Sequence, residues 1–183
     1  MKFEYDDSGR LWSADAFLLA RTNGTTGGDS YPGTNRNDTY NGLAGGDSIH
    51  GLKGNDILRG GAGGDAIYGD EGRDRLLGGA DGDLLSGGTG KDILTGGTAG
   101  DSFVFATTFG ADVITDFNAS TVVPSEHDTI NLSNVESITD FNDLVVNHLT
   151  RDGHDLVIHA GSGDTLRLED VRLKDIDSSD FTF

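Results

Sequence analysis

Nine aspartates recur at intervals of nine residues along the first part of this 183-residue chain. They are Asp29, Asp38, Asp47, Asp56, Asp65, Asp74, Asp83, Asp92 and Asp101. Carboxylates held at one phase of a repeat offer oxygen ligands that suit a hard divalent cation. A merely solvated acidic surface would not require such spacing, so the series indicates a cation-binding site repeated along the fold.

The residues around each aspartate keep one nine-residue order from residue 24 to residue 104. Glycine opens every block, aspartate is sixth and a large apolar residue is eighth. The apolar residues are Tyr31, Tyr40, Ile49, Leu58, Ile67, Leu76, Leu85, Leu94 and Phe103. The fourth position is glycine in six blocks, and Arg36, Asp81 and Ala99 replace it in the other three. A fixed short period of this kind predicts a stack of repeated units.

Each block supplies a glycine-rich turn and then a minimal strand with one inward side chain. Two blocks make one coil of about 18 residues, and successive coils stack about 4.8 Å apart. Each aspartate then lies above the aspartate two blocks away, so the series forms two ladders. Carboxylates about 5 Å apart repel by about 1 to 3 kcal/mol per neighbour. Calcium between the coils offsets this repulsion and tolerates irregular geometry, whereas magnesium requires a strict octahedron.

Adjacent carboxylates define at most about seven calcium sites in the strict repeats, four on the ladder that starts at Asp29 and three on the ladder that starts at Asp38. The central turns with glycine at both the first and fourth positions are the best candidates, because such turns expose backbone carbonyls. Their fourth glycines are Gly45, Gly54, Gly63, Gly72 and Gly90. Occupancy is expected to fail first in the turns with Arg36, Asp81 and Ala99.

Over 81 residues the run resembles the G-G-x-G-x-D-x-U-x calcium repeat of the RTX (repeats-in-toxin) family. The resemblance implies an all-β protein, a parallel β-roll of the right-handed β-helix type with an irregular β-rich C-terminal cap. It also implies calcium held by aspartate carboxylates and backbone carbonyls, calcium-dependent folding and export by a bacterial type I secretion machinery. The layout is similar to the non-catalytic repeat modules of secreted alginate epimerases and to the C-terminal domains of type I-secreted proteases and lipases.

The segments on either side of the repeats are expected to close the stack. Residues 1–23 form an N-terminal cap or linker, with a strand signal at Phe3 and Tyr5 and a helix signal over Ala14–Arg21. Residues 105–183 form a degenerate β-roll cap, because the pattern Asp-x-apolar recurs there without the strict period. It begins at Asp112, Asp128, Asp155 and Asp164. The expected core residues are Ile114, Phe117, Ile130, Leu132, Leu156, Ile158, Leu166 and Leu168.

Two further features of the C-terminal region are expected from its sequence. A short helix capped by Thr139 or Asp140 lies within residues 137–146. The acidic-then-apolar ending at Asp180–Phe183 resembles the uncleaved C-terminal secretion signal of RTX-type proteins. A final strand that closes the stack is compatible with the same residues.

Composition limits the classes of partner. The formal net charge is −18, which opposes nucleic acid and anionic membranes as general partners. The chain has no cysteine, so it has neither disulfides nor thiolate metal sites, and no apolar run approaches a membrane span of about 20 residues. The acidic N-terminus does not have the form of a signal peptide, and the protein is expected to be secreted through another signal.

No catalytic motif is recognisable in the chain. The five histidines lack the H-E-x-x-H spacing, and neither G-x-S-x-G nor G-K-[ST] occurs. The sequence therefore predicts a non-catalytic calcium-binding module that supports secretion and the stability of an attached enzyme, toxin or adhesin domain. The alternative is a module that binds an acidic, alginate-like polysaccharide through Arg59 and Arg75 on an outer sheet face. Those arginines could equally pack against an attached catalytic domain or offset local negative charge.

Overall fold

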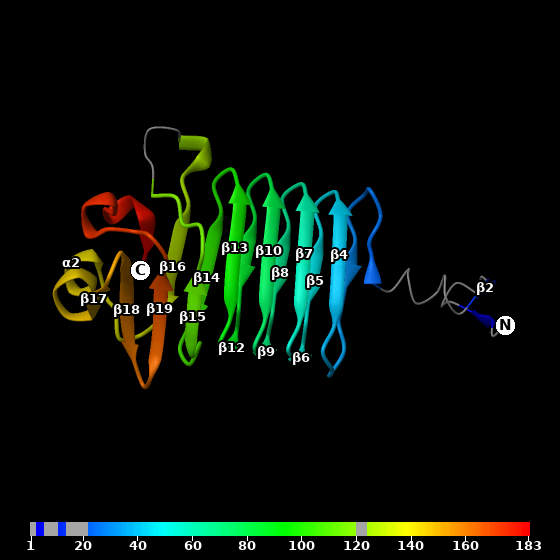
Figure 1. Ribbon diagram of the computed structural model, residues 1–183, viewed down its shortest axis with the longest axis horizontal. Coiled ribbons are helices and arrows are strands. Elements are labelled where there is room, and N and C mark those ends of the chain that lie inside the picture. The colour runs from blue at the N-terminus through cyan, green and yellow to red at the C-terminus, as the bar shows by residue number, and fades with distance from the viewer. Residues whose placement is uncertain (1–2, 6–10, 14–21, 120–123) are drawn as a thin grey trace.

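A computed structural model describes residues 3–5, 11–13, 22–119 and 124–183. Two long sheets of mostly parallel strands face each other along the length of the molecule (Figure 1). The eight-stranded sheet comprises, in order, β4 (Thr39–Ala44), β7 (Ile57–Ala62), β10 (Arg75–Ala80), β13 (Ile93–Thr98), β15 (Ala111–Ile114), β19 (Asp164–Leu168), β18 (Asp155–Gly161) and β17 (Leu149–Asp152). The seven-stranded sheet comprises β3 (Ser30–Tyr31), β5 (Ser48–His50), β8 (Ala66–Tyr68), β11 (Leu84–Ser86), β14 (Ser102–Ala106), β16 (Thr129–Asn134) and β20 (Phe181–Thr182).

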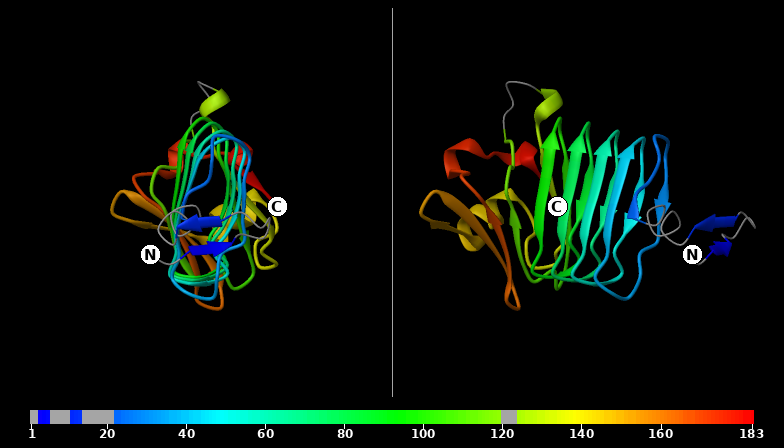
Figure 2. Two further views of the ribbon diagram at one scale, coloured as in Figure 1. Left: turned by 90° about the vertical axis from the view of Figure 1, so that its right-hand side faces the viewer. Right: turned by 45° about the vertical axis from the view of Figure 1, so that its right-hand side comes forward.

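The chain alternates between the two sheets, so every pair of blocks completes one coil. Leu58 lies opposite Leu76 and Ile49 lies opposite Ile67, a register of 18 residues in both sheets. Viewed from the end of the stack, the coils superimpose in one flattened outline (Figure 2). The predicted parallel β-roll with two nonapeptide blocks per coil is confirmed.

The two sides of each coil differ in length. Strands of the eight-stranded sheet run for six residues in β4, β7, β10 and β13, whereas β5, β8 and β11 run for three. The shorter side continues into a small third sheet of β6 (Lys53–Gly54), β9 (Glu71–Gly72) and β12 (Thr89–Gly90). The three-residue strand expected for every block therefore describes only one side of the roll.

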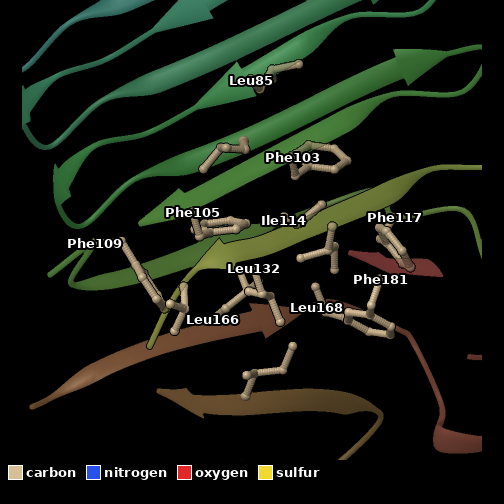
Figure 3. Close-up of a cluster of buried hydrophobic side chains, with 14 of the residues drawn as sticks. Leu85, Phe103, Phe105, Phe109, Ile114, Phe117, Leu132, Leu166, Leu168 and Phe181 are labelled. Carbon is tan, nitrogen blue, oxygen red and sulfur yellow. The ribbon is translucent and has the colours of Figure 1, made fainter. Parts of the chain in front are cut away.

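The interior of the repeat stack, residues 24–104, is one apolar side chain thick on each sheet. The eighth-position residues from Tyr40 to Phe103 are buried, with at most 4% of each exposed. The core widens in the C-terminal region, residues 105–183, where Phe105, Phe109 and Phe117 join it (Figure 3). All eight core residues predicted for that region are buried, each at 7% exposure or less.

The C-terminal region continues the stack and then departs from it. The strands β15 and β19 pair in parallel beyond β13, and β16 and β20 do so beyond β14. However, β18 runs antiparallel to both β17 and β19. Asp155 therefore begins a hairpin strand rather than another coil, although its sequence resembles the repeat.

Short helices occupy the links of the C-terminal region. They are the α-helix α2 (Phe141–Asp143), a π-helix at Leu144–His148 and 3₁₀ helices at Pro124–Glu126, Leu173–Asp175 and Ser178–Asp180. The Asp140 side chain caps α2 by accepting a hydrogen bond from the Asp143 N–H, as one of the two sequence alternatives predicted. Among the described residues, no helix is long and apolar enough to span a membrane.

The N-terminal strands β1 (Phe3–Tyr5) and β2 (Leu11–Ser13) form an antiparallel sheet of their own. The strand signal at Phe3 and Tyr5 is thus confirmed, whereas the helix predicted over 14–21 lies outside the described residues. That residues 1–23 serve as a cap or linker stays a prediction.

Candidate metal centre

The backbone turns place the nine predicted aspartates in two ladders. In each ladder the Oδ1 atom of an aspartate accepts a hydrogen bond from the backbone N–H of the aspartate one coil earlier, at 2.7–2.8 Å within the repeats. The first ladder contains Asp29, Asp47, Asp65, Asp83 and Asp101, and the second contains Asp38, Asp56, Asp74 and Asp92. Hydrogen bonds from backbone to carboxylate therefore link blocks two apart, and a cation that links the same blocks stays a prediction.

The second oxygen has no partner in seven of these nine carboxylates and in Asp112. In eight aspartates the Oδ2 atom is buried and forms no hydrogen bond, and the residues are 1–4% exposed. They are Asp47, Asp56, Asp65, Asp74, Asp83, Asp92, Asp101 and Asp112. An unpaired buried ionised oxygen destabilises a fold unless a positive charge or donor satisfies it. A divalent cation at Oδ2 would satisfy all eight in the same way.

The glycine that opens each block leaves room for this oxygen. A Cβ on Gly42 would collide with Asp47 Oδ2 and with the carbonyl oxygen of Gly60 in the next coil. The same two collisions, shifted by nine residues, would occur at Gly51. Glycine is therefore required because the carboxylate oxygen and a backbone carbonyl converge on its Cα. These are the kinds of oxygen that calcium binds.

Burial alters the protonation of the ladder. Desolvation, and secondarily the neighbouring carboxylates, raise the pKa values of Asp74, Asp83 and Asp101 to about 7. Desolvation raises that of Asp92 to about 6. Ionisation of these groups is therefore less favourable than that of an exposed aspartate, and a nearby cation would lower their pKa values again.

The fourth position of the third to ninth blocks adopts a left-handed backbone conformation. Gly45 has φ of +101° and Gly54 has φ of +142°, values that favour glycine. Asp81 and Ala99 nevertheless keep φ of +75° and +78°, and the Asp83 and Asp101 carboxylates that follow them retain a buried, unpaired Oδ2. The turns predicted to be weak at these two positions therefore keep the ladder geometry, at some backbone strain.

The first rung of each ladder differs from the rest. The Oδ2 atom of Asp29 accepts hydrogen bonds from the Thr25 N–H at 2.6 Å and the Thr25 hydroxyl at 3.0 Å. Thr34 engages Asp38 Oδ2 in the same way, at 2.7 and 2.9 Å. Sequence reasoning missed these threonine caps, although the spacing T-x-x-x-D at the two leading blocks was visible. The geometry thus separates two of the nine candidate ligands from the other seven.

Both ladders also continue past the strict repeats. Asp92 N–H donates to Asp112 Oδ1 at 2.9 Å, and Asp101 N–H donates to Asp128 Oδ1 at 2.8 Å. The separations are 20 and 27 residues, because insertions lengthen these coils. The Asp128 Oδ2 atom accepts a hydrogen bond from the Asn118 N–H at 2.8 Å, which completes that carboxylate within the protein.

No three histidine, cysteine or acidic side chains of the described residues converge on one point. Each position along a ladder offers one or two carboxylates, so a cation there would take its remaining oxygens from backbone carbonyls and water. That ligand set is typical of calcium. The donor chemistry and the unpaired oxygens therefore fit calcium, and the fourth-position glycines remain predicted carbonyl ligands.

The two candidate arginines lie away from the ladders. Arg59 in β7 is opposite Leu77, and Arg75 in β10 is opposite Ile57, so both belong to the outward-facing rows of the eight-stranded sheet. Arg75 is exposed and Arg59 is half-buried. Across the described residues neither guanidinium forms an ion pair.

Comparison with known proteins agrees with the ladder geometry. Residues 32–67 and 68–103 each match the family model of the RTX calcium-binding nonapeptide repeat, which spans four copies. The extracellular lipase LipA from Serratia marcescens is similar in structure, with a TM-score of 0.50 and 17% identity over 87% of this chain and 39% of the lipase. This chain thus corresponds to about two fifths of the lipase's length.

A second solved structure is that of a subunit of the mannuronan C5-epimerase from Azotobacter vinelandii. It aligns with a TM-score of 0.38 and 23% identity over 87% of this chain and 80% of the subunit. No curated protein matches the chain in sequence.

Proposed function

We propose that the chain is a calcium-loaded module of a secreted bacterial protein. The premise is that residues 32–103 are RTX calcium-binding nonapeptide repeats. In this proposal the module folds when it binds calcium, supports type I secretion and stabilises an attached domain. The observation that carries it is the row of buried Oδ2 atoms without a partner. The matched repeats are a non-catalytic module, and we propose that the chain as a whole performs no catalysis.

The proposed ligands are the seven unpaired carboxylates of the strict repeats and neighbouring backbone carbonyls. The carboxylates are Asp47, Asp56, Asp65, Asp74, Asp83, Asp92 and Asp101. Bound calcium supplies the positive charge that the buried oxygens lack. The chain's own part is to hold each Oδ1 on a backbone N–H, which aims Oδ2 at the opening glycine of its block.

Calcium then determines when the chain folds. The free energy of binding becomes free energy of folding when only the folded state holds the site. At the low calcium concentration inside a cell the stack would remain unfolded and fit for export, and it would fold outside. The ending Asp180–Phe183 lies within the fold as part of β20 and its flanks, with Asp180 fully buried. A secretion machinery that reads this segment would have to do so before folding.

Circular dichroism with and without calcium tests the proposal. At about pH 8 most of the β-sheet signal, that of the repeat stack, should disappear with a chelator and return with calcium, and Asp65→Asn should raise the calcium concentration at the midpoint. Asp70→Asn is the matched control, because Asp70 lies in a neighbouring turn but outside both ladders, and asparagine tolerates its positive φ. A chain that stays folded in chelator, or an Asp65→Asn variant that responds as the control does, would contradict the proposal.

The two unpaired arginines favour a second candidate function. Arg59 and Arg75 lie on adjacent strands of one outer face of an otherwise acidic protein. We propose that this face contacts an acidic polysaccharide. Titration calorimetry with alginate should then show weaker binding for Arg59→Ala/Arg75→Ala than for the unaltered chain, with calcium binding unchanged. Equal binding by an Arg36→Ala control is expected, and no affinity of the unaltered chain for alginate would remove this candidate.

A further inference from the structure

A tenth block follows the nine strict repeats. Two extra residues, Phe105 and Ala106, separate it from the ninth block, and it spans residues 107–115 with the sequence TTFGADVIT. Glycine is still fourth, aspartate sixth and a buried isoleucine eighth, but threonine replaces the opening glycine. Two inserted residues therefore interrupt the nine-residue period before this block. The block itself keeps three of the four residue types that define the repeat and lacks only the opening glycine.

The structure places this block as the next coil on the second ladder. Val113 lies opposite Ile93, Ile114 lies opposite Leu94, and Gly110 forms a parallel bridge with Gly90. Gly110 has φ of +96°, in the left-handed region like the other fourth-position glycines. Ile114 points into the shared core, beneath Phe103 and beside Phe105 in the view of Figure 3. The turn before Asp112 is thus built like the turns of the strict repeats.

Asp112 has the same incomplete set of contacts as the aspartates of the repeats. It is 1% exposed, and its Oδ1 accepts a hydrogen bond from the Asp92 N–H at 2.9 Å. Its Oδ2 is buried and has no hydrogen-bond partner. A buried carboxylate oxygen that is left without a donor calls for a positive charge.

A second carboxylate shapes the turn around Asp112. Asp164, at the start of β19, accepts hydrogen bonds from the Thr108 N–H at 3.0 Å through Oδ2 and from the Gly110 N–H at 2.9 Å through Oδ1. Both Asp164 oxygens therefore hold the backbone of the block. The position of Asp164 also adds negative charge near Asp112, which increases the demand for a cation there.

The first ladder ends differently and supplies an internal contrast. Asp128 takes the corresponding place, with Oδ1 on the Asp101 N–H and 3% exposure. Its Oδ2 accepts a hydrogen bond from the Asn118 N–H, so the protein itself supplies the donor that Asp112 lacks. The carboxylates at the ends of the two ladders therefore differ in whether Oδ2 has a hydrogen-bond donor within the protein.

We propose that Asp112 holds one further calcium ion, outside the nine strict repeats, in the turn of residues 107–112. This inference rests on the proposed function, because it assumes that calcium occupies the ladders. Asp112 is a ligand and Asp164 is a positioning residue that fixes the backbone of the turn. Since β15 joins β13 of the stack to β19 of the C-terminal region, the ion fastens the eighth block of the stack to that region.

Counting ions per folded chain tests the site directly. Native mass spectrometry at saturating calcium should show one ion fewer in Asp112→Asn than in the unaltered chain, because the amide keeps the acceptor for Asp92 N–H but removes the ionised oxygen. Asp128→Asn, the matched control, should lose none. An unchanged count in Asp112→Asn would overturn the inference, whereas no calcium in the unaltered chain would overturn the proposed function itself.

Asp164→Asn provides a second test of the proposed calcium site, which holds even if Asp112→Asn folds poorly. With Asp164 in a positioning role, this variant should keep the full count at saturating calcium and release one ion about tenfold more readily on dilution. Hydrogen exchange in residues 108–115 should become faster in the same calcium range. A variant with unchanged affinity and exchange would contradict the role assigned to Asp164.

Discussion

The repeat stack and the C-terminal region bury the same type of residue in opposite ways. In the stack, carboxylates from Asp47 to Asp101 keep one oxygen without a donor. In the C-terminal region, Asp128 is completed by Asn118, Asp164 by two backbone amides, and Asp180 by His127 and the Asp177 N–H. The first region therefore needs something from solution to complete its polar interior, whereas the second supplies its own donors except at Asp112, where it joins the stack.

The apolar core is also smaller in the repeat stack than in the C-terminal region. Each strand of the stack contributes one inward side chain, so the core is narrow. The C-terminal region adds a group of aromatic rings, in which Phe105 and Phe109 lie edge to face at 5.1 Å between ring centres. Core size and carboxylate pairing together predict that calcium controls the stack more strongly than the C-terminal region.

The largest expected effect is that of pH on the calcium-free chain, because several carboxylates titrate together. Burial raises the folded-state pKa values of Asp74, Asp83 and Asp101 from an ordinary 3.8 to about 7. The folded state then holds protons that the unfolded state has released, so stability falls as pH rises from about 4 to about 7. A metal-stripped chain should therefore melt at a higher temperature at about pH 5 than at about pH 8.

Saturating calcium should reverse this pH dependence, because a cation favours the ionised carboxylates. Thermal denaturation followed by circular dichroism measures both series. A metal-stripped stack whose melting temperature rises with pH over the same interval would contradict the assignment of the buried, unpaired oxygens.

An interior rung should matter more than a first rung. Asp74→Ala removes a proposed calcium ligand and leaves the Asp56 N–H without an acceptor, which should lower the free energy of unfolding in calcium by about 3 to 5 kcal/mol. Asp29→Ala removes only the contacts with Thr25 and should cost about 1 kcal/mol. Urea denaturation in saturating calcium compares them, and equal losses would remove the distinction between the rungs.

The smallest expected effect comes from backbone strain in the stack. Ala99 keeps φ of +78° where most blocks have glycine, so Ala99→Gly should stabilise the chain by up to about 1 kcal/mol. Ala80→Gly is the control, because Ala80 lies in the strand β10 and should lose about 0.5 to 1 kcal/mol. Destabilisation of both variants to the same extent would show that the strain at residue 99 is negligible.

The stack could be predicted from the sequence because the nine-residue period also sets the pairing register between coils, which is 18 residues. Every glycine, aspartate and apolar position repeats at nine, so the two ladders and the inward residues followed directly. The threonine caps on Asp29 and Asp38 were not predicted, because the aspartate pattern alone does not show which oxygens find donors within the protein.

The C-terminal region was predicted only in part. Its core residues followed from hydrophobicity, but the pattern Asp-x-apolar occurs both at the turn before Asp112 and at the start of the hairpin strand at Asp155. Three residues do not distinguish these settings. The glycine two residues before the aspartate does not separate them either, because Gly110 precedes Asp112 and Gly153 precedes Asp155, both with positive φ.

Hydrogen exchange on the whole chain, with calcium and then with a chelator at about pH 8, tests the central claim most directly. With calcium, the amides of β7, β10 and β13 should be as protected as those of β18 and β19. After chelation the stack strands should lose their protection first and by orders of magnitude, while the β18–β19 pair retains part of its own. Stack strands that stay protected in chelator would contradict the claim that a cation completes the buried carboxylates.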